Sequence, residues 1–303
     1  MTDILITEFM DEAAVDCLRT AHSVTYDPGL ADRQDDLPGM MAGVRALIVR
    51  NRTQVRGALL AAADRLDCVG RLGVGLDNID VPACEARGAT VYPATGANDA
   101  SVAEYVIATA TALLRGAYMA TAAVAAGEWP RQALIGRELG GRTLGLVGYG
   151  AIARQTAERA RALGMDIVAH DPFVTSAEGT RMLALEALLA EADVVSLHVP
   201  LTPQTRHLID AEALARMRPD AILVNAARGG VVDETALAEA LRAGRLGGAA
   251  LDVFETEPLT AEAGATFAGL PNLILTPHIA GVTEESNVRV SSLIADRVLA
   301  HLG

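Results

Sequence analysis

The chain has few of the features that mark secreted or metal-binding proteins. Its three cysteines, Cys17, Cys68 and Cys84, match neither a redox pair nor a set of metal ligands, and any disulfide pairing would leave one over. No cluster of His, Cys and Asp has metal-ligand spacing in the sequence. We therefore expect no metal and reduced thiols, as in the cytoplasm.

Long apolar runs and a basic leader are missing as well. No run of about 18 uncharged apolar residues is present, which argues against a membrane-spanning helix. The stretch from Met1 to Glu8 has no basic region ahead of an apolar segment, so it does not resemble a signal peptide. The sequence thus predicts a cytoplasmic protein that has no membrane partner.

Basic and aromatic residues are scarce. The 38 Asp and Glu outnumber the 25 Lys and Arg, and the formal net charge is −13, which argues against nucleic acid as a partner. An anionic substrate would then need a local basic pocket. Aromatic residues are 3% of a chain that is 51% hydrophobic, so the core must consist of Ala, Leu, Val and Ile, as in layered α/β proteins. A length of 303 residues suits two domains.

Short apolar segments separated by helical segments predict parallel sheets with helices on both faces. In the first hundred residues the expected strands are Ile4–Thr7, Ser23–Tyr26, Ala46–Val49, Leu66–Leu72 and Thr90–Tyr92. From residue 141 onward they are Thr143–Gly148, Asp166–His170, Val194–His198, Ala221–Asn225, Gly248–Val253 and Asn272–Thr276. Six strands are the number in a complete dinucleotide-binding fold.

Helical patterns fill the remainder of the chain. A long helix is predicted to open near Asn98, with a capping box at Ser101–Glu104, and to run to about Met119. A domain boundary is placed at its start. A further helix is expected over 120–139, and it contains the single tryptophan, Trp129, either in a local core or at a subunit interface. The last segment, 283–302, is an amphipathic helix.

The segment Thr143–Arg154 organises the second half of the chain. A buried strand leads into Gly148-Tyr149-Gly150-Ala151-Ile152-Ala153, a Gly-x-Gly-x-x-Ala turn, and then into a helix. The first glycine allows the turn, the second lets the backbone approach a pyrophosphate, and the small third residue lets helix and strand pack closely. The helix N-terminus supplies free N–H groups. Alone, the motif is also compatible with an ordinary glycine turn.

An acidic residue at the end of the next strand strengthens the dinucleotide interpretation. Asp171 follows Asp166–His170 and lies 21 residues after Gly150. A carboxylate there accepts hydrogen bonds from the adenine ribose and repels a 2′-phosphate, which predicts NAD over NADP. The alternative is a strand-end turn before Pro172.

Polar residues follow the carboxyl ends of several predicted strands, where open α/β sheets bind ligands. A protonated histidine can give a proton to the carbonyl oxygen of a 2-oxo acid as hydride reaches the carbon. A carboxylate beside it orients the imidazole, and an arginine holds the substrate carboxylate. We assign these roles to His278, Glu257 and Arg228. Taken singly, each could instead be an ordinary loop or surface residue.

Several motifs resemble the D-isomer-specific 2-hydroxyacid dehydrogenase family over nearly the whole chain. They are the segments at 70–80, 101–105, 148–153, 225–234, 252–258 and 276–281. The resemblance implies a Rossmann NAD-binding domain, residues 99–282, inserted in a flavodoxin-like substrate domain, residues 1–98 and 283–303. It also implies closure on the substrate, a homodimer built through the NAD-binding domains, and Arg228, Glu257 and His278 as the catalytic residues.

The predicted ligand contacts follow from the strand ends and from the resemblance together. Those for NAD are Gly148, Tyr149, Gly150, Ala151, Ile152, Asp171, His198, Val199, Pro200, Thr205, Ala226, Asp252 and Gly281, with Asp252 facing the nicotinamide carboxamide. Those for the substrate are Arg50, Asn51, Arg52, Val74, Gly75, Asn98, Arg228 and His278, with Val74 and Gly75 offering backbone N–H groups to the carboxylate.

The loop Arg50–Thr53 bears on which acid is used. By resemblance it faces the distal end of the substrate, where two arginines would suit a second anionic group. Within the family, the segments 47–53 and 70–80 look most like sulfolactate dehydrogenases. The alternatives are a 3-phosphoglycerate dehydrogenase, a general hydroxypyruvate or glyoxylate reductase, in which Arg50 or Arg52 is structural, and a non-catalytic NADH-sensing scaffold of the corepressor type.

Overall fold

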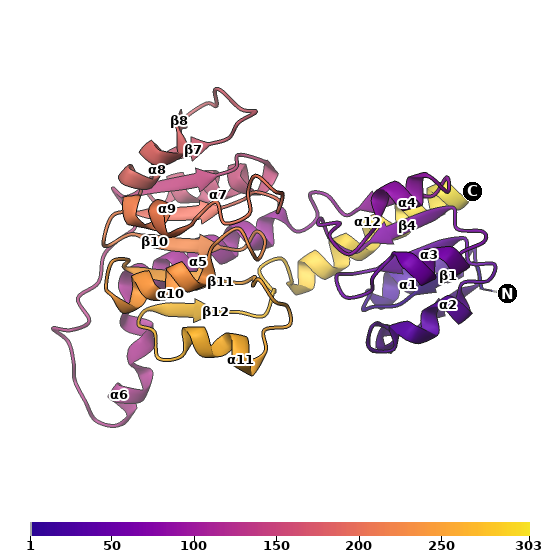
Figure 1. Ribbon diagram of the computed structural model, residues 1–303, viewed down its shortest axis with the longest axis horizontal. Helices are drawn as coiled ribbons and strands as arrows, with labels where there is room; N and C mark the ends of the chain where they lie inside the picture. Colours follow the sequence, from indigo (N-terminus) through magenta and orange to yellow (C-terminus); the bar gives the residue numbers. More distant parts are fainter. Residues whose placement is uncertain (1) are drawn as a thin grey trace. The chain divides into compact units, whose positions relative to one another are not determined.

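The computed structural model describes residues 2–303, which divide into two compact units (Figure 1). The first unit is formed by the chain up to Asn98 together with Val282–Gly303, and the second is Asp99–Gly281. The chain thus leaves the first unit once and returns to it for its last helix.

The first unit contains, within the described residues, a five-stranded parallel sheet in the order β2-β1-β3-β4-β5. Its strands are β1 (Ile4–Ile6), β2 (Val24–Tyr26), β3 (Ala46–Val49), β4 (Cys68–Arg71) and β5 (Thr90–Pro93). Each predicted strand of this region is confirmed, to within two residues at its ends. Its helices are α1 (Glu12–Arg19), α2 (Leu37–Met40), α3 (Gly57–Ala62), α4 (Val81–Glu85) and α12 (Glu284–Leu302), with 3₁₀ turns η1 (Pro28–Asp32) and η2 (Gln34–Asp36).

The last helix, α12, packs on the first unit because a glycine makes room for it. Ile294 and Val298 of α12 are buried with Ile4 and Ile6 of β1. A Cβ on Gly70 of β4 would come within 2.5 Å of the Ile294 side chain. The close approach explains why a helix at the end of the chain belongs to the unit at its beginning.

The second unit contains, among residues 2–303, a seven-stranded parallel sheet in the order β12-β11-β10-β9-β6-β7-β8. Its strands are β6 (Thr143–Val147), β7 (Asp166–His170), β8 (Arg181–Met182), β9 (Val194–Leu197), β10 (Ile222–Asn225), β11 (Gly248–Leu251) and β12 (Leu273–Leu275). From β8 to β11 this is the Rossmann order, and the strand order reverses between β6 and β9. The two-residue edge strand β8, paired with β7, was not predicted because it is too short to show a pattern.

Helices cover both faces of this sheet. Val106 and Leu113 of α5 (Asp99–Arg115) are buried with Ala153 and Ala157 of α7 (Ala151–Ala162). The other face is covered by α8, α9 and α10, and its core includes Leu188, Leu214 and Leu237. The bounds of the remaining helices are α8 (Leu185–Glu191), α9 (Ala211–Arg216), α10 (Glu234–Arg242), α11 (Ala261–Gly264) and η4 (Ala265–Phe267).

The predicted long helix is confirmed, but it ends before Met119, and the predicted helix over 120–139 was wrong. Helix α5 begins at Asp99, ahead of the predicted capping box, and ends at Arg115, before Gly116 at φ +60°. Beyond it only η3 (Ala117–Ala120) and α6 (Thr121–Ala125) are helical, because Gly127 adopts φ +88° and Pro130 follows. Trp129 is 74% exposed, so it does not fill a local core.

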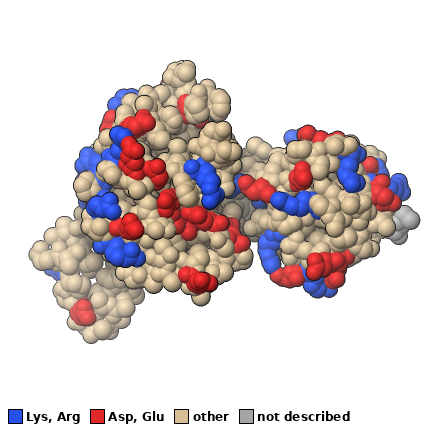
Figure 2. Space-filling view, viewed as in Figure 1, with Lys and Arg blue, Asp and Glu red and all other residues tan. Residues whose placement is uncertain are grey.

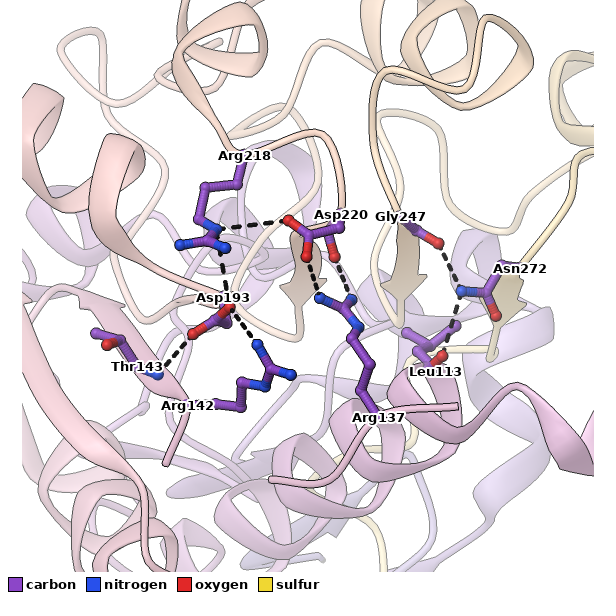
Figure 3. Close-up of polar contacts among 9 residues, drawn as sticks. All are labelled: Leu113, Arg137, Arg142, Thr143, Asp193, Arg218, Asp220, Gly247 and Asn272. Atoms are coloured by element: carbon purple, nitrogen blue, oxygen red, sulfur yellow. Dashed lines mark hydrogen bonds and ion pairs between the residues drawn. The ribbon is translucent and has the colours of Figure 1, made fainter. Parts of the chain in front are cut away.

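An ion-pair network lies at the amino-terminal edge of the seven-stranded sheet (Figure 3). Asp193, just before β9, accepts a hydrogen bond from Thr143 N at 2.9 Å, and it pairs with Arg142 at 3.5 Å and Arg218 at 3.8 Å. Arg218 and Arg137 also pair with Asp220, just before β10. The network fastens the segment that follows α6 to the sheet.

Among residues 2–303, no single helix is long and apolar enough to cross a membrane. Helix α5 and the helical residues 117–125, which are bent relative to each other, are long and apolar enough only when taken together.

Candidate active site

Three neighbouring strands, β10, β11 and β12, bring the predicted catalytic residues to one edge of the sheet. Arg228 lies three residues after β10, Glu257 follows β11, and His278 follows β12. Because parallel strands end at the same edge, residues far apart in the sequence gather there.

His278 and Glu257 form a hydrogen-bonded pair. Nδ1 of His278 lies 2.7 Å from Oε2 of Glu257, and the two side chains are 36% and 31% exposed. Burial alone would raise the pKa of Glu257, but the hydrogen bond and charge of His278, the N–H of Phe254 and the charge of Arg228 together lower it. Glu257 is therefore held as a carboxylate beside the imidazole.

The loop that contains His278 is held by Asp252, which is 1% exposed. The Asp252 carboxylate accepts hydrogen bonds from the Thr276 hydroxyl at 2.5 Å and from the N–H groups of Ile279 and Ala280 at 2.8 Å each. His278 itself has a left-handed φ of +56°, and its N–H is bonded to Asp252 O at 2.8 Å. The sequence pointed to Asp252 as a carboxamide ligand, whereas here its carboxylate already fixes an unfavourable backbone turn.

A tyrosine from α5 extends this network. The Tyr105 hydroxyl lies 2.7 Å from the hydroxyl of Thr276, and burial raises the pKa of Tyr105 to about 12. Sequence reasoning noted the motif that contains Tyr105 but assigned it no role, because only the fold brings α5 next to the end of β12.

The Arg228 loop is shaped by a buried asparagine. Asn225, 1% exposed, donates to Arg228 O at 3.0 Å and accepts from Ala227 N at 3.1 Å. A Cβ on Gly229 would collide with Phe254 O, so only glycine lets this loop pass beside the loop that follows β11. Ala226, predicted to contact NAD, lies in the same loop and is partly exposed.

The glycine-rich turn after β6 has the geometry that a dinucleotide requires. Gly148 has φ +89°, and a Cβ there would come within 2.6 Å of His198 O. A Cβ on Gly150 would meet nothing within 4 Å, so this glycine faces open space. Gly150 is the N-cap of α7 and gives it no side-chain cap, which leaves the first-turn N–H groups for a ligand. These residues fit the pyrophosphate of NAD.

The other predicted cofactor residues follow strands β7, β9 and β12. Asp171 Oδ2 accepts from Tyr149 N and Oδ1 from Phe173 N, each at 2.8 Å, which fixes the carboxylate at the end of β7. Val199 and Pro200 follow His198 after β9, and the Thr205 hydroxyl is bonded to Pro200 O at 2.6 Å. Gly281 is the last residue of the second unit.

The predicted substrate arginines belong to the first unit and differ in their partners. Arg52 forms an exposed ion pair with Asp32. Arg50 is partly buried, donates to Oδ1 of Asn287 at 2.6 Å and lies 5.9 Å from the centre of the Phe9 ring. Both contacts are to neutral groups, and no carboxylate among residues 2–303 pairs with its guanidinium. Asn51, between the two, is exposed.

The loop after β4 offers backbone donors. Val74 and Gly75 follow Gly73, and no hydrogen bond from either N–H reaches an atom of the described chain. Gly73 has φ +153°, a backbone conformation that L side chains rarely adopt, so this turn favours glycine. Asn98, the remaining predicted contact, has a buried Oδ1 that finds no partner among residues 2–303.

Comparison with known proteins identifies the family. Residues 107–280 match the model of the D-isomer-specific 2-hydroxyacid dehydrogenase NAD-binding domain. The chain is 58% identical to an (S)-sulfolactate dehydrogenase of Chromohalobacter salexigens, over 100% of this chain and 99% of that protein. It is 40% identical to a D-3-phosphoglycerate dehydrogenase of Methanocaldococcus jannaschii, over 98% of this chain and 57% of that longer one.

A solved structure, the TT0316 protein of Thermus thermophilus, aligns with a TM-score of 0.92 at 36% identity, covering 99% of this chain and 96% of the other. Together with the matched NAD-binding domain and the geometry at the ends of β10 to β12, these findings establish that the chain is an NAD-dependent oxidoreductase of the D-isomer-specific 2-hydroxyacid dehydrogenase family.

Proposed function

We propose that His278 is the acid–base catalyst of this oxidoreductase, that Glu257 orients it, and that Arg228 holds the substrate carboxylate and polarises its carbonyl. The observation that supports the assignment is the 2.7 Å bond between His278 and Glu257, in the loop next to that of Arg228.

The roles follow from which atoms are already engaged. NAD, when bound, supplies or accepts the hydride at the substrate's second carbon. Because Nδ1 of His278 is bonded to Glu257, Nε2 is the nitrogen that gives a proton to the carbonyl oxygen during reduction and takes it back during oxidation. Glu257, whose pKa is lowered, stays ionised and stabilises the imidazolium.

The turn from Gly148 to Ile152 is proposed to bind the pyrophosphate through its backbone, and Asp171 the adenine ribose. The other contacts stay as predicted, at His198, Val199, Pro200, Thr205, Ala226, Asp252 and Gly281. Because Gly150 faces open space, Gly150→Ala should leave the fold intact and place a methyl group where the cofactor lies.

We expect the Kd of NADH, measured by fluorescence, to rise on the order of tenfold in Gly150→Ala while Tm changes little. Gly39→Ala is the matched control, since a Cβ there also meets nothing within 4 Å. Unchanged NADH affinity in Gly150→Ala would contradict the assignment. A preference of the wild-type enzyme for NADPH would contradict the role given to Asp171.

The substrate is proposed to be a C3 2-hydroxy acid with a second anionic group, sulfolactate being the first choice. The first unit is proposed to bind both ends of this substrate. The carboxylate would be bound by the N–H groups of Val74 and Gly75, with help from Asn98. The distal anion would be bound by Arg50, Asn51 and Arg52. The partly buried Arg50, whose guanidinium contacts the neutral Asn287 and Phe9 side chains, supports an anion site. So does the 58% identity to an (S)-sulfolactate dehydrogenase.

The test is NADH oxidation with 3-sulfopyruvate, 3-phosphohydroxypyruvate, hydroxypyruvate, glyoxylate and pyruvate. We expect a strong preference for 3-sulfopyruvate, and we expect Arg50→Gln to raise its KM about tenfold or more with little effect on pyruvate. Arg33→Gln, in the same unit but in an exposed ion pair with Asp27, is the control. A preference for 3-phosphohydroxypyruvate would favour a 3-phosphoglycerate dehydrogenase, and a preference for hydroxypyruvate would favour a general hydroxypyruvate or glyoxylate reductase. No activity with any of these acids would favour the non-catalytic scaffold.

The protein is further proposed to be a cytoplasmic homodimer that binds neither nucleic acid nor membrane. Apolar side chains on the segment after α5 support a dimer: Tyr118, Met119, Trp129 and Ile135 are 52–75% exposed. The chain has no lysine, and on the face shown in Figure 2 its arginines are interspersed with acidic residues, which argues against a nucleic-acid-binding surface. Light scattering should give a dimer, and Trp129→Glu should weaken it; a monomeric wild-type protein would contradict the proposal.

A further inference from the structure

A buried glutamate organises the loop that contains the two proposed anion-binding arginines. Glu8 follows β1 and is 4% exposed. Its Oε1 accepts from Arg50 N and Thr53 N at 2.9 Å each, and its Oε2 accepts from Arg52 N at 3.2 Å. One carboxylate therefore receives three backbone N–H groups of a four-residue stretch.

Converging N–H groups of this kind form an anion-binding concavity. Here the protein itself supplies the anion, because the Glu8 carboxylate occupies the concavity. The carbonyl groups of the same loop are held from another direction, since Asn78 Nδ2, in a side chain that is 5% exposed, donates to Arg50 O at 3.1 Å and Thr53 O at 2.7 Å. Two buried side chains thus hold the backbone of residues 50–53, Glu8 through its N–H groups and Asn78 through its carbonyl groups.

The consequence is that three of the four backbone N–H groups of this loop are unavailable to a substrate anion, which leaves its side chains and the N–H group of Asn51. The N–H groups of Arg50, Arg52 and Thr53 are directed at Glu8, so they cannot also bind a sulfonate or phosphate. The loop sets the starting point of the Arg50 side chain, which then runs over Phe9 to Asn287. A shift of the backbone would move the guanidinium.

We propose that Glu8 is a positioning residue that determines selectivity for the second anionic group of the substrate, by fixing the loop from which Arg50 extends. The inference rests on the proposed function, because it assumes that Arg50 binds that group.

Glu8→Gln should affect binding of a dianionic substrate in opposite directions through the loop position and through the charge. Glu8→Gln removes a negative charge beneath two arginines, which by charge alone would tighten binding of a dianion. It also replaces the acceptor of Arg52 N with an amide group that donates, while the carbonyl oxygen can still accept from Arg50 N and Thr53 N. Positioning therefore predicts weaker binding despite the added positive charge.

The experiment measures kcat and KM for 3-sulfopyruvate and pyruvate, with Tm, in the full-length enzyme. We expect Glu8→Gln to raise the KM for 3-sulfopyruvate several-fold and Glu8→Ala about tenfold or more. The KM for pyruvate should change much less, so the ratio of kcat/KM values should fall. A lower KM for 3-sulfopyruvate in Glu8→Gln, or an unchanged ratio in both variants, would overturn the proposal.

Two further variants separate positioning from loss of stability. Asp11→Ala removes the N-cap of α1 in the same unit, so it should lower Tm and leave the ratio unchanged. Asn78→Ala releases the loop carbonyls without changing any charge, and it should lower the ratio as Glu8→Gln does. This variant decides the matter if Glu8→Ala does not fold. An unchanged ratio in Asn78→Ala would contradict the proposal.

The substrate preference of the wild-type enzyme separates the proposal for the substrate from the proposal for Glu8. A wild-type enzyme that prefers the dianion, with Glu8 variants that keep the preference, refutes the role of Glu8 and leaves the substrate proposal standing. A wild-type enzyme with no such preference refutes the substrate proposal, and the role of Glu8 in selectivity falls with it.

Discussion

The amino-terminal and carboxyl-terminal edges of the seven-stranded sheet both contain acidic residues and arginines, but these residues have different roles at the two edges. At the amino-terminal edge, Asp193 and Asp220 pair with three arginines and hold backbone in place (Figure 3). At the carboxyl-terminal edge, Glu257 and Asp252 hold His278, which adopts a left-handed backbone conformation and remains 36% exposed.

The difference shows that charge alone does not mark a site. Both edges contain acids and arginines, and each has a non-glycine residue at positive φ, Asn272 at the amino-terminal edge and His278 at the carboxyl-terminal edge. The difference is that His278 has a titratable, accessible side chain bonded to a carboxylate. Non-glycine residues at positive φ cost free energy and persist where the surroundings over-determine them. Substitutions at the carboxyl-terminal edge should therefore reduce turnover, and those at the amino-terminal edge should reduce stability.

The largest effect is expected from His278→Gln. Loss of the proton donor should lower kcat by about 10² to 10⁴-fold, with Tm nearly unchanged. Steady-state kinetics and a thermal melt measure both quantities. Arg218→Gln, at the other edge, is the control and should retain full turnover. Activity of His278→Gln within a few-fold of wild type would contradict the assignment of the catalyst.

Asp193→Ala should show the opposite behaviour. The substitution removes a buried carboxylate that bonds to Thr143 N and pairs with Arg142 and Arg218, so the free energy of unfolding should fall by about 3 kcal/mol. Urea denaturation measures this, and kcat of the folded fraction should be unchanged. Glu191→Gln, which breaks an exposed pair with Arg181, should cost less than about 1 kcal/mol. Equal losses of unfolding free energy in Asp193→Ala and Glu191→Gln would contradict this expectation.

Thr276→Val tests the support of the catalytic loop. The hydroxyl connects Tyr105 to Asp252, and its loss should lower kcat about tenfold through a less well placed His278. The KM for NADH should change little. Tyr105→Phe, which keeps the bond between Thr276 and Asp252, should have a smaller effect. A rise in the KM for NADH without loss of kcat would instead indicate that Asp252 acts mainly on the cofactor.

The last prediction concerns the effect of pH on stability. Burial lowers the pKa of His198 from 6.5 to about 4. As the pH falls from about 6.5 to about 4, the unfolded chain binds the proton first, so acidification destabilises the folded state and stability rises again with pH. His198→Gln should remove about 1–3 kcal/mol of this acid sensitivity. Melts from pH 4 to 7 test it, and identical pH profiles of Tm in wild type and variant would exclude the effect.

Strand ends and glycine positions were readable from the sequence because their causes are local. Buried parallel strands are continuous apolar runs, and Gly148 is required by the turn itself. The helix over 120–139 was mispredicted because Gly127 and Pro130 interrupt it after α6. The strand β8 was missed because two residues have no periodicity.

Local pattern alone thus determined the two α/β units, the dinucleotide turn, and the arrival of Arg228, Glu257 and His278 at one edge of a sheet. Only the tertiary structure decided which carboxylates hold which loops. Glu8 reaches residues 50–53 across more than forty positions, and Tyr105 reaches Thr276 across 171. The physical reason is that periodicity reports which face of an element is buried, whereas a long-range hydrogen bond depends on the packing of elements that are distant in sequence.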